Sequence, residues 1–279
     1  MRLGAPVYGD VSTPEAWIAA LKKQNYRAAY CPLPLDASDS LIQEYVQAAA
    51  EADIVIAEVG AWSNPLSLDP STKLKAVEKC ILSLELAEKV GARCCVNISG
   101  SRGAIWDGPD AHNLTPETFD KIVETTRLIL DRVKPKRTFY TLETMPWAYP
   151  DSVESYQKLI EAIDRPQFAV HLDPANLINS PRLYFENANL IRDCFATFGA
   201  RIKSCHAKDI TLDSRMTVHL DETRPGLGNL DYRVFLKELA KLDPDTPLML
   251  EHLPNESEYL AAAAFIREVE SELGKAHQS

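Results

Sequence analysis

Hydrophobic positions along the chain change repeatedly from short apolar runs to longer segments with helical spacing, and this change occurs eight times. Each short run is a strand candidate, and each longer segment is a helix candidate. Some runs, such as residues 53–60, are apolar almost throughout, as is typical of strands buried on both faces of a parallel sheet. The pattern predicts strands at residues 3–9, 28–33, 53–60, 94–99, 139–143, 168–173, 202–206 and 248–251.

Capping residues and helix-stopping residues mark the predicted helix boundaries. Thr13 and Thr115 each precede a proline, which indicates a cap followed by a first-turn proline. Gly91 follows a periodic segment and is typical of a C-terminal stop. The first helix is predicted to begin at residue 13. The others are predicted at residues 40–52, 71–90, 115–133, 151–163, 181–198, 231–242 and 256–274. The segment after the seventh strand, up to residue 230, is predicted to be a long polar loop.

Eight alternating β and α units imply parallel strands joined by right-handed helical crossovers. Eight is the number of units that closes a (β/α)8 TIM barrel, so the predicted fold is an α/β barrel forming a single domain over residues 1–275. Residues 276–279 are predicted to be a frayed tail. An open doubly wound sheet is the alternative, but no G-x-G-x-x-G motif follows the first strand.

Composition and charge narrow the classes of partner and compartment. The chain has 279 residues, 46% of them hydrophobic, and its net charge of −10 disfavours nucleic acid and anionic membranes as partners. No apolar run of about 18 residues is present, and residues 1–6 lack the apolar core of a signal peptide. The six cysteines are scattered without zinc-site spacing, as is typical of reduced thiols. These features predict a cytoplasmic protein.

Chemically useful side chains stand where four successive predicted strands end. Asp173 closes the strand at 168–173, and Pro174 then ends the ladder. In an α/β barrel the carboxyl ends of the strands meet at one mouth, so the side chains at these four ends are expected to converge. The residues concerned are Glu143, Asp173, His206 and Glu251.

Three converging carboxylates would repel one another, and a divalent cation removes that penalty. A set of three carboxylates and one imidazole suits Mn or Mg more than structural zinc, while Co or Zn remains possible. Four protein ligands also leave positions on an octahedral ion for two substrate oxygens. A single such residue is more often a helix cap or a hydrogen-bonded core residue, but four on consecutive strands favour a metal site.

Two further motifs accompany these residues: His206-Ala-Lys-Asp209 and Pro225-Gly-Leu-Gly-Asn-Leu-Asp-Tyr232. With them, essentially the whole chain resembles the xylose isomerase-like barrel superfamily. That group contains sugar-phosphate isomerases and epimerases, inosose dehydratase, dehydroshikimate dehydratase and endonuclease IV. The resemblance implies a small sugar-like substrate and suggests a homo-oligomer. It also implies one divalent metal ion, held by Glu143, Asp173, His206 and Glu251.

Three positions depart from the pattern of the ketose 3-epimerases in this superfamily. Tyr149 stands in place of a second glutamate, Asn176 in place of a histidine and Leu212 in place of an arginine. The two-base machinery of those epimerases is therefore incomplete. The strand ends that carry extra zinc ligands in endonuclease IV offer Glu58, Asn97 and Asn176 here, which disfavours a nuclease.

Two residues are further catalytic candidates, each with a plainer alternative. Lys208 lies two residues after His206 and could polarise a carbonyl or protonate an enediolate, or it could pair with Asp209 as a loop lysine. Glu58 ends the third strand and is the best spare carboxylate for a general base, or it is a surface or capping residue. His252 is predicted by alternation to face away from Glu251, unless a turn at the strand end brings it back.

Loop and strand positions around the expected mouth supply substrate-binding candidates. Tryptophan faces in these loops suit the apolar faces of sugar rings. His171, one layer below the strand end, is either support for the site or core, and Arg102 holds an anion or sugar hydroxyl or is solvated. The predicted substrate-binding residues are His171, Trp62, Arg102, Trp147, Asn176, His219 and Arg224.

The favoured hypothesis is a metal-dependent isomerase or epimerase that acts on a sugar, sugar phosphate or related polyol ketone through an enediolate. The catalytic candidates are Glu143, Glu251, Lys208 and Glu58. Expulsion of a β-leaving group from the same intermediate would make the protein a dehydratase or lyase. A barrel that binds a sugar-like ligand through its metal without turnover is the other alternative.

Overall fold

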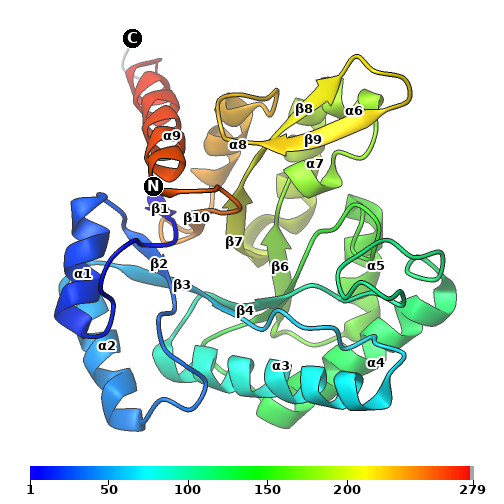
Figure 1. The fold of residues 1–279 in the computed structure, drawn as a ribbon, viewed down its shortest axis with the longest axis horizontal. Helices are drawn as coiled ribbons and strands as arrows, with labels where there is room; N and C mark the ends of the chain where they lie inside the picture. The colour runs from blue at the N-terminus through cyan, green and yellow to red at the C-terminus, as the bar shows by residue number, and fades with distance from the viewer. Residues whose placement is uncertain (277–279) are drawn as a thin grey trace.

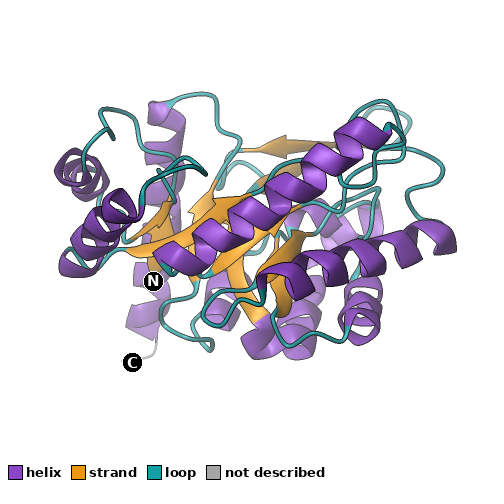
Figure 2. Ribbon diagram, turned by 90° about the horizontal axis from the view of Figure 1, so that it is seen from below, coloured by secondary structure: helices purple, strands orange, loops and turns teal. Residues whose placement is uncertain are grey.

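The computed structural model describes residues 1–276, and it contains a closed barrel of eight parallel strands surrounded by helices (Figures 1 and 2). The strands follow one another around the barrel in the order β1-β10-β7-β6-β5-β4-β3-β2. This arrangement confirms the predicted α/β (β/α)8 TIM barrel. The barrel strands are β1 Arg2–Gly4, β2 Ala28–Tyr30, β3 Val55–Gly60, β4 Cys94–Asn97, β5 Tyr140–Glu143, β6 Phe168–Leu172, β7 Ile202–Ala207 and β10 Pro247–Leu250.

Most of the helices begin at side-chain caps. Thr13 Oγ1 accepts a hydrogen bond from Ala16 N at 3.2 Å, and Thr115 Oγ1 accepts one from Thr118 N at 3.3 Å. Gly91 ends α3 in the left-handed conformation, with φ of 70°. The helices are α1 Pro14–Lys23, α2 Asp39–Glu51, α3 Pro70–Val90, α4 Pro116–Val133, α5 Val153–Ile163, α6 Pro181–Phe185, α7 Asn187–Phe198, α8 Tyr232–Leu239 and α9 Glu256–Ala276, with short 3-10 turns at Ala175–Leu177 and Gly199–Arg201.

The structure corrects the sequence prediction in two segments. The predicted polar loop after β7 contains an antiparallel hairpin of β8 (Asp209–Asp213) and β9 (His219–Thr223). The helix predicted at 181–198 is divided between α6 and α7. The division falls beside Asn187, whose side-chain amide donates to the backbone oxygens of Tyr184 and Asn229 instead of facing solvent.

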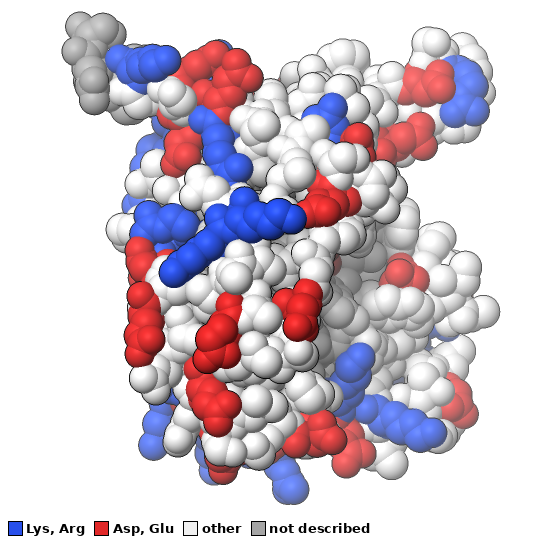
Figure 3. Space-filling view, turned by 60° about the vertical axis from the view of Figure 1, so that its left-hand side comes forward, with Lys and Arg blue, Asp and Glu red and all other residues white. Residues whose placement is uncertain are grey.

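The predicted tail begins within the last helix. Ala276 still belongs to α9, and residues 277–279 lie outside the described residues. Among the residues that the structure describes, no helix is both long and apolar enough to cross a membrane. On the face in Figure 3, acidic side chains flank the row of basic side chains that crosses its middle.

Two layers of packing hold the barrel in shape. Outside the strands, apolar side chains pack under the surrounding helices in one continuous core. Inside, several inward-facing positions near the carboxyl ends carry polar side chains, which are buried together. These buried polar residues include Glu58, Glu143, His171, Asp173, Ser204, His206 and Lys208. A polar interior at one end of a barrel is where the candidate chemistry must be sought.

The hairpin extends directly from a barrel strand. One residue, Lys208, separates β7 from β8, so the hairpin continues the course of β7 beyond the barrel. Figure 1 shows the hairpin in yellow beside α6, above the carboxyl ends of the strands. The hairpin therefore stands at one side of the mouth.

Candidate metal centre at the mouth of the barrel

The four predicted metal ligands come together at one point. Glu143 ends β5, and His206 lies near the end of β7. Asp173 and Glu251 directly follow β6 and β10. One ligand atom of each residue lies within 4.8 Å of those of the other three. His206 Nδ1 is 2.9 Å from Glu143 Oε1 and 2.8 Å from Glu251 Oε1.

This donor set fits a divalent cation. Ligands on opposite sides of an octahedral magnesium ion are about 4.2 Å apart, because each bond is about 2.1 Å long. The four donor atoms already lie within 4.8 Å of one another, so a small contraction would complete the coordination. Asp173 Oδ2 and Glu251 Oε1 are both buried, and both lie beside the single ammonium of Lys208. One ammonium does not balance three converging carboxylates, and a divalent metal ion would supply the remaining positive charge.

Lys208 is a fixed cation within this group of acids. Its Nζ lies 2.6 Å from Glu251 Oε1, 3.0 Å from Asp173 Oδ2 and 3.6 Å from Glu143 Oε1. Burial lowers the pKa of the Lys208 ammonium, but the surrounding carboxylates outweigh burial and hold that pKa well above its usual value. Burial raises the pKa of Asp173 to about 6, although Lys208 acts in the opposite direction. Lys208 therefore stays charged and offsets part of the negative charge.

A second polar group lies deeper in the barrel, around Glu58 of β3. The Glu58 side chain is buried, and three side chains from β6 and β7 reach it. His171 Nε2 lies 2.9 Å from Oε1, His206 Nε2 lies 3.3 Å from Oε2, and Ser204 Oγ donates to Oε1. Burial alone would raise the pKa of Glu58, but His171 and His206 outweigh burial and hold that pKa far below its usual value. Glu58 is therefore an ionised hydrogen-bond acceptor.

His206 joins the deep group to the four converging residues. Its Nε2 faces Glu58, while its Nδ1 faces Glu143 and Glu251. Metal-binding histidines commonly donate their second N–H to a carboxylate, which fixes the ring and its tautomer. Burial lowers the pKa of His206, but the nearby carboxylates outweigh burial and raise it well above its usual value. A metal ion at Nδ1 would therefore have to displace a proton.

A cavity of about 710 Å³ opens beside the four converging residues. Its polar lining includes Glu143, Glu251 and Lys208. Its aromatic lining consists of Tyr30, Trp62, Trp106, Trp147 and Tyr259. The structure thus brings three of the predicted substrate-binding residues to one cavity: Trp62, Trp147 and Asn176.

The other predicted substrate-binding residues and one catalytic candidate do not line this cavity. His171 is buried against Glu58, and Glu58 itself is 1% exposed. Arg102 Nη1 donates to a backbone oxygen at 3.4 Å, and Arg224 pairs with a glutamate of α9 at 2.9 Å. His219 is the first residue of β9. None of these five side chains is part of the cavity lining.

Two further residues, Glu222 and His252, lie at the mouth although neither is a predicted site residue. Glu222 Oε2 lies 3.1 Å from His252 Nδ1 and 3.8 Å from Lys208 Nζ. Glu222 belongs to β9, and the alternation of polar and apolar residues at 209–213 is the one signal that could have indicated a strand of this hairpin. His252, the second residue after β10, adopts a φ of 57° and lines the cavity, so its side chain faces the mouth and not away from it.

Asp209 explains the second motif in physical terms. Its Oδ2 accepts hydrogen bonds from Gly226 N at 2.9 Å and from Gly228 N at 3.1 Å. Its Oδ1 accepts from Leu230 N at 2.8 Å and from Ile210 N at 2.9 Å. A Cβ at Gly228 would lie 2.2 Å from Asp209 Oδ1, so the turn must approach the acid without a side chain. Asp209 thus fastens the glycine-containing turn to the start of the hairpin.

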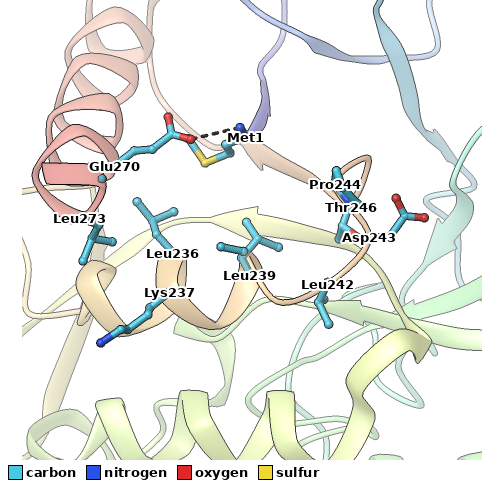
Figure 4. Close-up of a pocket in the computed structure, with 12 residues that line it drawn as sticks. Met1, Leu236, Lys237, Leu239, Leu242, Asp243, Pro244, Thr246, Glu270 and Leu273 are labelled. Atoms are coloured by element: carbon cyan, nitrogen blue, oxygen red, sulfur yellow. Dashed lines mark ion pairs between the residues drawn. The ribbon is translucent and has the colours of Figure 1, made fainter. Parts of the chain in front are cut away.

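A second cavity, of about 380 Å³, lies at the opposite end of the barrel (Figure 4). Its lining is largely aliphatic and includes Leu236, Leu239 and Leu273 from α8 and α9. The amino group of Met1 pairs with Glu270 Oε1 at 3.1 Å beside it. Within residues 1–276, neither group of potential metal ligands lies there. Because barrels of this kind carry their chemistry at the carboxyl ends of the strands, this cavity is not the candidate site.

Comparisons with known proteins agree with this architecture. A family model described as a xylose isomerase-like TIM barrel matches residues 18–269. No curated protein matches the chain. Among solved structures, endonuclease IV from Thermus thermophilus superposes with a TM-score of 0.74 at 14% identity, over 98% of this chain and 100% of that chain.

Two other solved structures are similar over nearly their whole length. D-psicose 3-epimerase from Clostridium cellulolyticum, determined with D-tagatose, has a TM-score of 0.68 at 16% identity, over 96% of this chain and 99% of that one. A xylose isomerase-like TIM barrel protein from Mycobacterium smegmatis, in complex with magnesium, has a TM-score of 0.66 at 17% identity, over 94% and 91%. At these identities the similarity shows the fold and leaves the chemistry to be argued from the site.

Proposed function

Because the chain belongs to the xylose isomerase-like TIM barrel family, we propose that it is a divalent-metal-dependent isomerase or epimerase of a sugar, sugar phosphate or related polyol ketone. The observation that carries the proposal is the convergence of four potential ligands beside an aromatic-lined cavity. These residues are Glu143, Asp173, His206 and Glu251. Mg or Mn is the favoured ion, since three donors are carboxylate oxygens. The similar protein from Mycobacterium smegmatis, in complex with magnesium, supports this choice.

An ion held by these residues would polarise neighbouring carbonyl and hydroxyl oxygens and acidify the C–H bond beside the carbonyl. The protein must then take that proton and return it. Glu143 and Glu251 both line the cavity, and they come from β5 and β10, which β6 and β7 separate in the barrel. Tyr149 stands where the ketose 3-epimerases have a second glutamate, so the pair of bases would here be Glu143 and Glu251, one taking the proton and the other returning it.

Neighbouring side chains prepare these groups for proton transfer. Asn176 Nδ2 donates to Glu143 Oε1 at 3.3 Å and to Thr144 O at 3.0 Å, which holds Glu143 in place. Lys208, which lines the cavity, would donate a hydrogen bond to a substrate oxygen on which negative charge develops. The exposed faces of Trp62 and Trp147 are apolar surfaces suited to the C–H faces of a sugar.

The test combines a metal count with proton exchange. Protein loaded with magnesium is expected to hold one ion per chain and to exchange deuterium from heavy water into a carbon beside the carbonyl of a free ketohexose. Glu251→Gln, which keeps the shape of the side chain but removes the base, should lower the exchange rate by about 10²-fold or more. Bound metal with no exchange into any ketose would refute the proposal and leave a sugar-binding barrel.

The same experiment separates the other activities. An unsaturated product that forms with exchange identifies a dehydratase or lyase, because elimination begins with loss of the same proton. A nuclease of the endonuclease IV kind would require a cluster of zinc ions. Among the described residues, the deep group of potential ligands shares His206 with the first group, and its members already bond to one another. A count of one ion per chain would exclude such a cluster.

A further inference from the structure

We propose that the substrate is an uncharged polyol or ketose rather than a phosphate ester or carboxylate, and that Glu222 of the hairpin enforces this choice. This inference rests on the proposed function and narrows its substrate class. Its basis is the pairing of the basic side chains that line the cavity and of the backbone N–H groups in three loops around it.

The charges around the cavity are already matched. Glu143, Asp173 and Glu251 together balance one divalent ion plus the Lys208 ammonium, which lies within 3.6 Å of an oxygen of each. The other basic group of the cavity lining, His252, pairs with Glu222 at 3.1 Å. Asp107 also lines the cavity and adds a further negative charge. An entering phosphate would meet no positive charge in this lining that lacks an acidic partner.

Several backbone N–H groups in the loops at the mouth also have acceptors within the protein. TIM barrels commonly bind phosphate through glycine-rich turns after the late strands. Here the N–H groups of Gly226 and Gly228 both donate to Asp209, at 2.9 and 3.1 Å. The N–H groups of Ala175 and Asn176 donate to Asp173 Oδ1, at 2.9 and 3.2 Å.

The glycine-containing loop after β4 is occupied in the same way. The backbone N–H groups of Ser101, Arg102 and Gly103 donate to side-chain oxygens of the protein at 3.0, 2.8 and 3.0 Å. The Arg102 guanidinium itself donates to a backbone oxygen, and Arg224 pairs with Glu258. Arg102, Arg224 and the seven backbone N–H groups named above thus all have partners within the protein.

The cavity instead offers groups that suit hydroxyls and C–H bonds. The carboxylate of Glu222 can accept hydrogen bonds from two neighbouring hydroxyl groups, and the amide of Asn176 can donate or accept. The indole faces of Trp62, Trp106 and Trp147 supply flat apolar surface. Glu222 therefore has two effects on selection: it accepts from hydroxyl groups and repels an anion at the same position.

The test measures deuterium exchange for matched pairs of substrates with the magnesium-loaded protein. The pairs are D-fructose, D-psicose and D-tagatose, each with its 6-phosphate. Wild-type protein is expected to favour the free sugar of the best pair by about tenfold or more in kcat/KM, because like charges oppose binding of the phosphate. Glu222→Gln should reduce that ratio several-fold and raise KM for the free sugar.

Asp221→Asn is the matched control. It removes the same charge at the neighbouring position of β9, where alternation directs the side chain to the other face and away from the cavity lining. It should leave the ratio unchanged. A phosphate that reacts as well as its free sugar, or a ratio that Glu222→Gln and Asp221→Asn change equally, would overturn the inference. Exchange with no member of any pair would instead refute the proposed function, so the two failures are distinguishable.

Discussion

Replacement of Glu58 tests whether its carboxylate holds together the buried polar side chains inside the barrel. This carboxylate is 1% exposed and accepts from His171, Ser204 and His206. Glu58→Met fills a similar volume but provides no acceptor for these three buried donors. Each unpaired donor costs about 1–3 kcal/mol, but neighbouring losses are not additive. By analogy with broken buried pairs, the expected loss in free energy of unfolding is about 3–5 kcal/mol.

The same change should weaken metal binding without touching a ligand. The His206 ring depends on Glu58 to hold Nε2, and loss of a carboxylate behind a ligating histidine typically costs about 10- to 100-fold in affinity. Glu58→Gln keeps one acceptor oxygen and should lose less affinity than Glu58→Met. Chemical denaturation of the metal-free protein measures the first effect, and calorimetric titration with Mn²⁺ measures the second.

Ser204→Ala provides the matched control for these variants. It removes one donor to Glu58 but leaves the contact between Glu58 and His206. We expect it to cost about 1 kcal/mol in stability and to change metal affinity by less than about threefold. If Glu58→Met bound Mn²⁺ as tightly as Ser204→Ala while both remained folded, the role assigned to Glu58 would be wrong.

Four further predictions follow from the same geometry. The Lys208→Met variant should bind Mg²⁺ more tightly than the wild-type protein, because the Lys208 ammonium competes with the ion for the same carboxylates. Without metal, the variant should unfold at a lower denaturant concentration than the wild type. Weaker Mg²⁺ binding would contradict this reasoning. Asp209→Ala leaves four backbone N–H groups without their acceptor and should cost about 2–4 kcal/mol in unfolding free energy, whereas an unchanged denaturation midpoint would refute its fastening role. Mg²⁺ affinity should rise with pH through neutrality, because His206, whose pKa is raised, must lose a proton before it can bind the ion. A Mg²⁺ affinity that stays constant from about pH 6 to pH 8 would disprove this. In the metal-free protein, the carboxylates that raise the pKa of His206 stabilise the folded state at pH values below the ordinary histidine pKa. This stabilisation is lost as the pH rises through the raised pKa of His206. Chemical denaturation at a series of pH values would measure the change.

The barrel and the positions of the four converging residues were predictable for the same reason. Apolar runs of strand length reveal buried parallel strands, and parallel strands place their last residues at one edge. Glu143, Asp173 and Glu251 needed only this rule, because each stands within one residue of a strand end. The same rule places His206 at this edge, but it does not show that Glu58 lies behind the His206 ring.

The environment of Glu58 could not be predicted, because it depends on packing across the barrel. Glu58 ends a predicted strand, as a catalytic acid would, but His171, Ser204 and His206 enclose it from β6 and β7. Strand alternation gives the face of each residue and not the depth at which side chains from distant strands meet. The hairpin was missed for a related reason: each of its strands has only the other to pair with, and polar residues predominate in β9.

The direct junction between β7 and β8 restricts how the mouth can move. A flexible lid needs a few residues that can absorb a change in backbone angles. Here Lys208 alone joins the strands, and its own side chain is held among acids. Any swing of the hairpin would pull that ammonium away from them at an electrostatic cost. We therefore expect the β8–β9 hairpin to stay in place at one side of the mouth. Ligands would then enter and leave on the side where Trp106 and Trp147 are about two-fifths exposed.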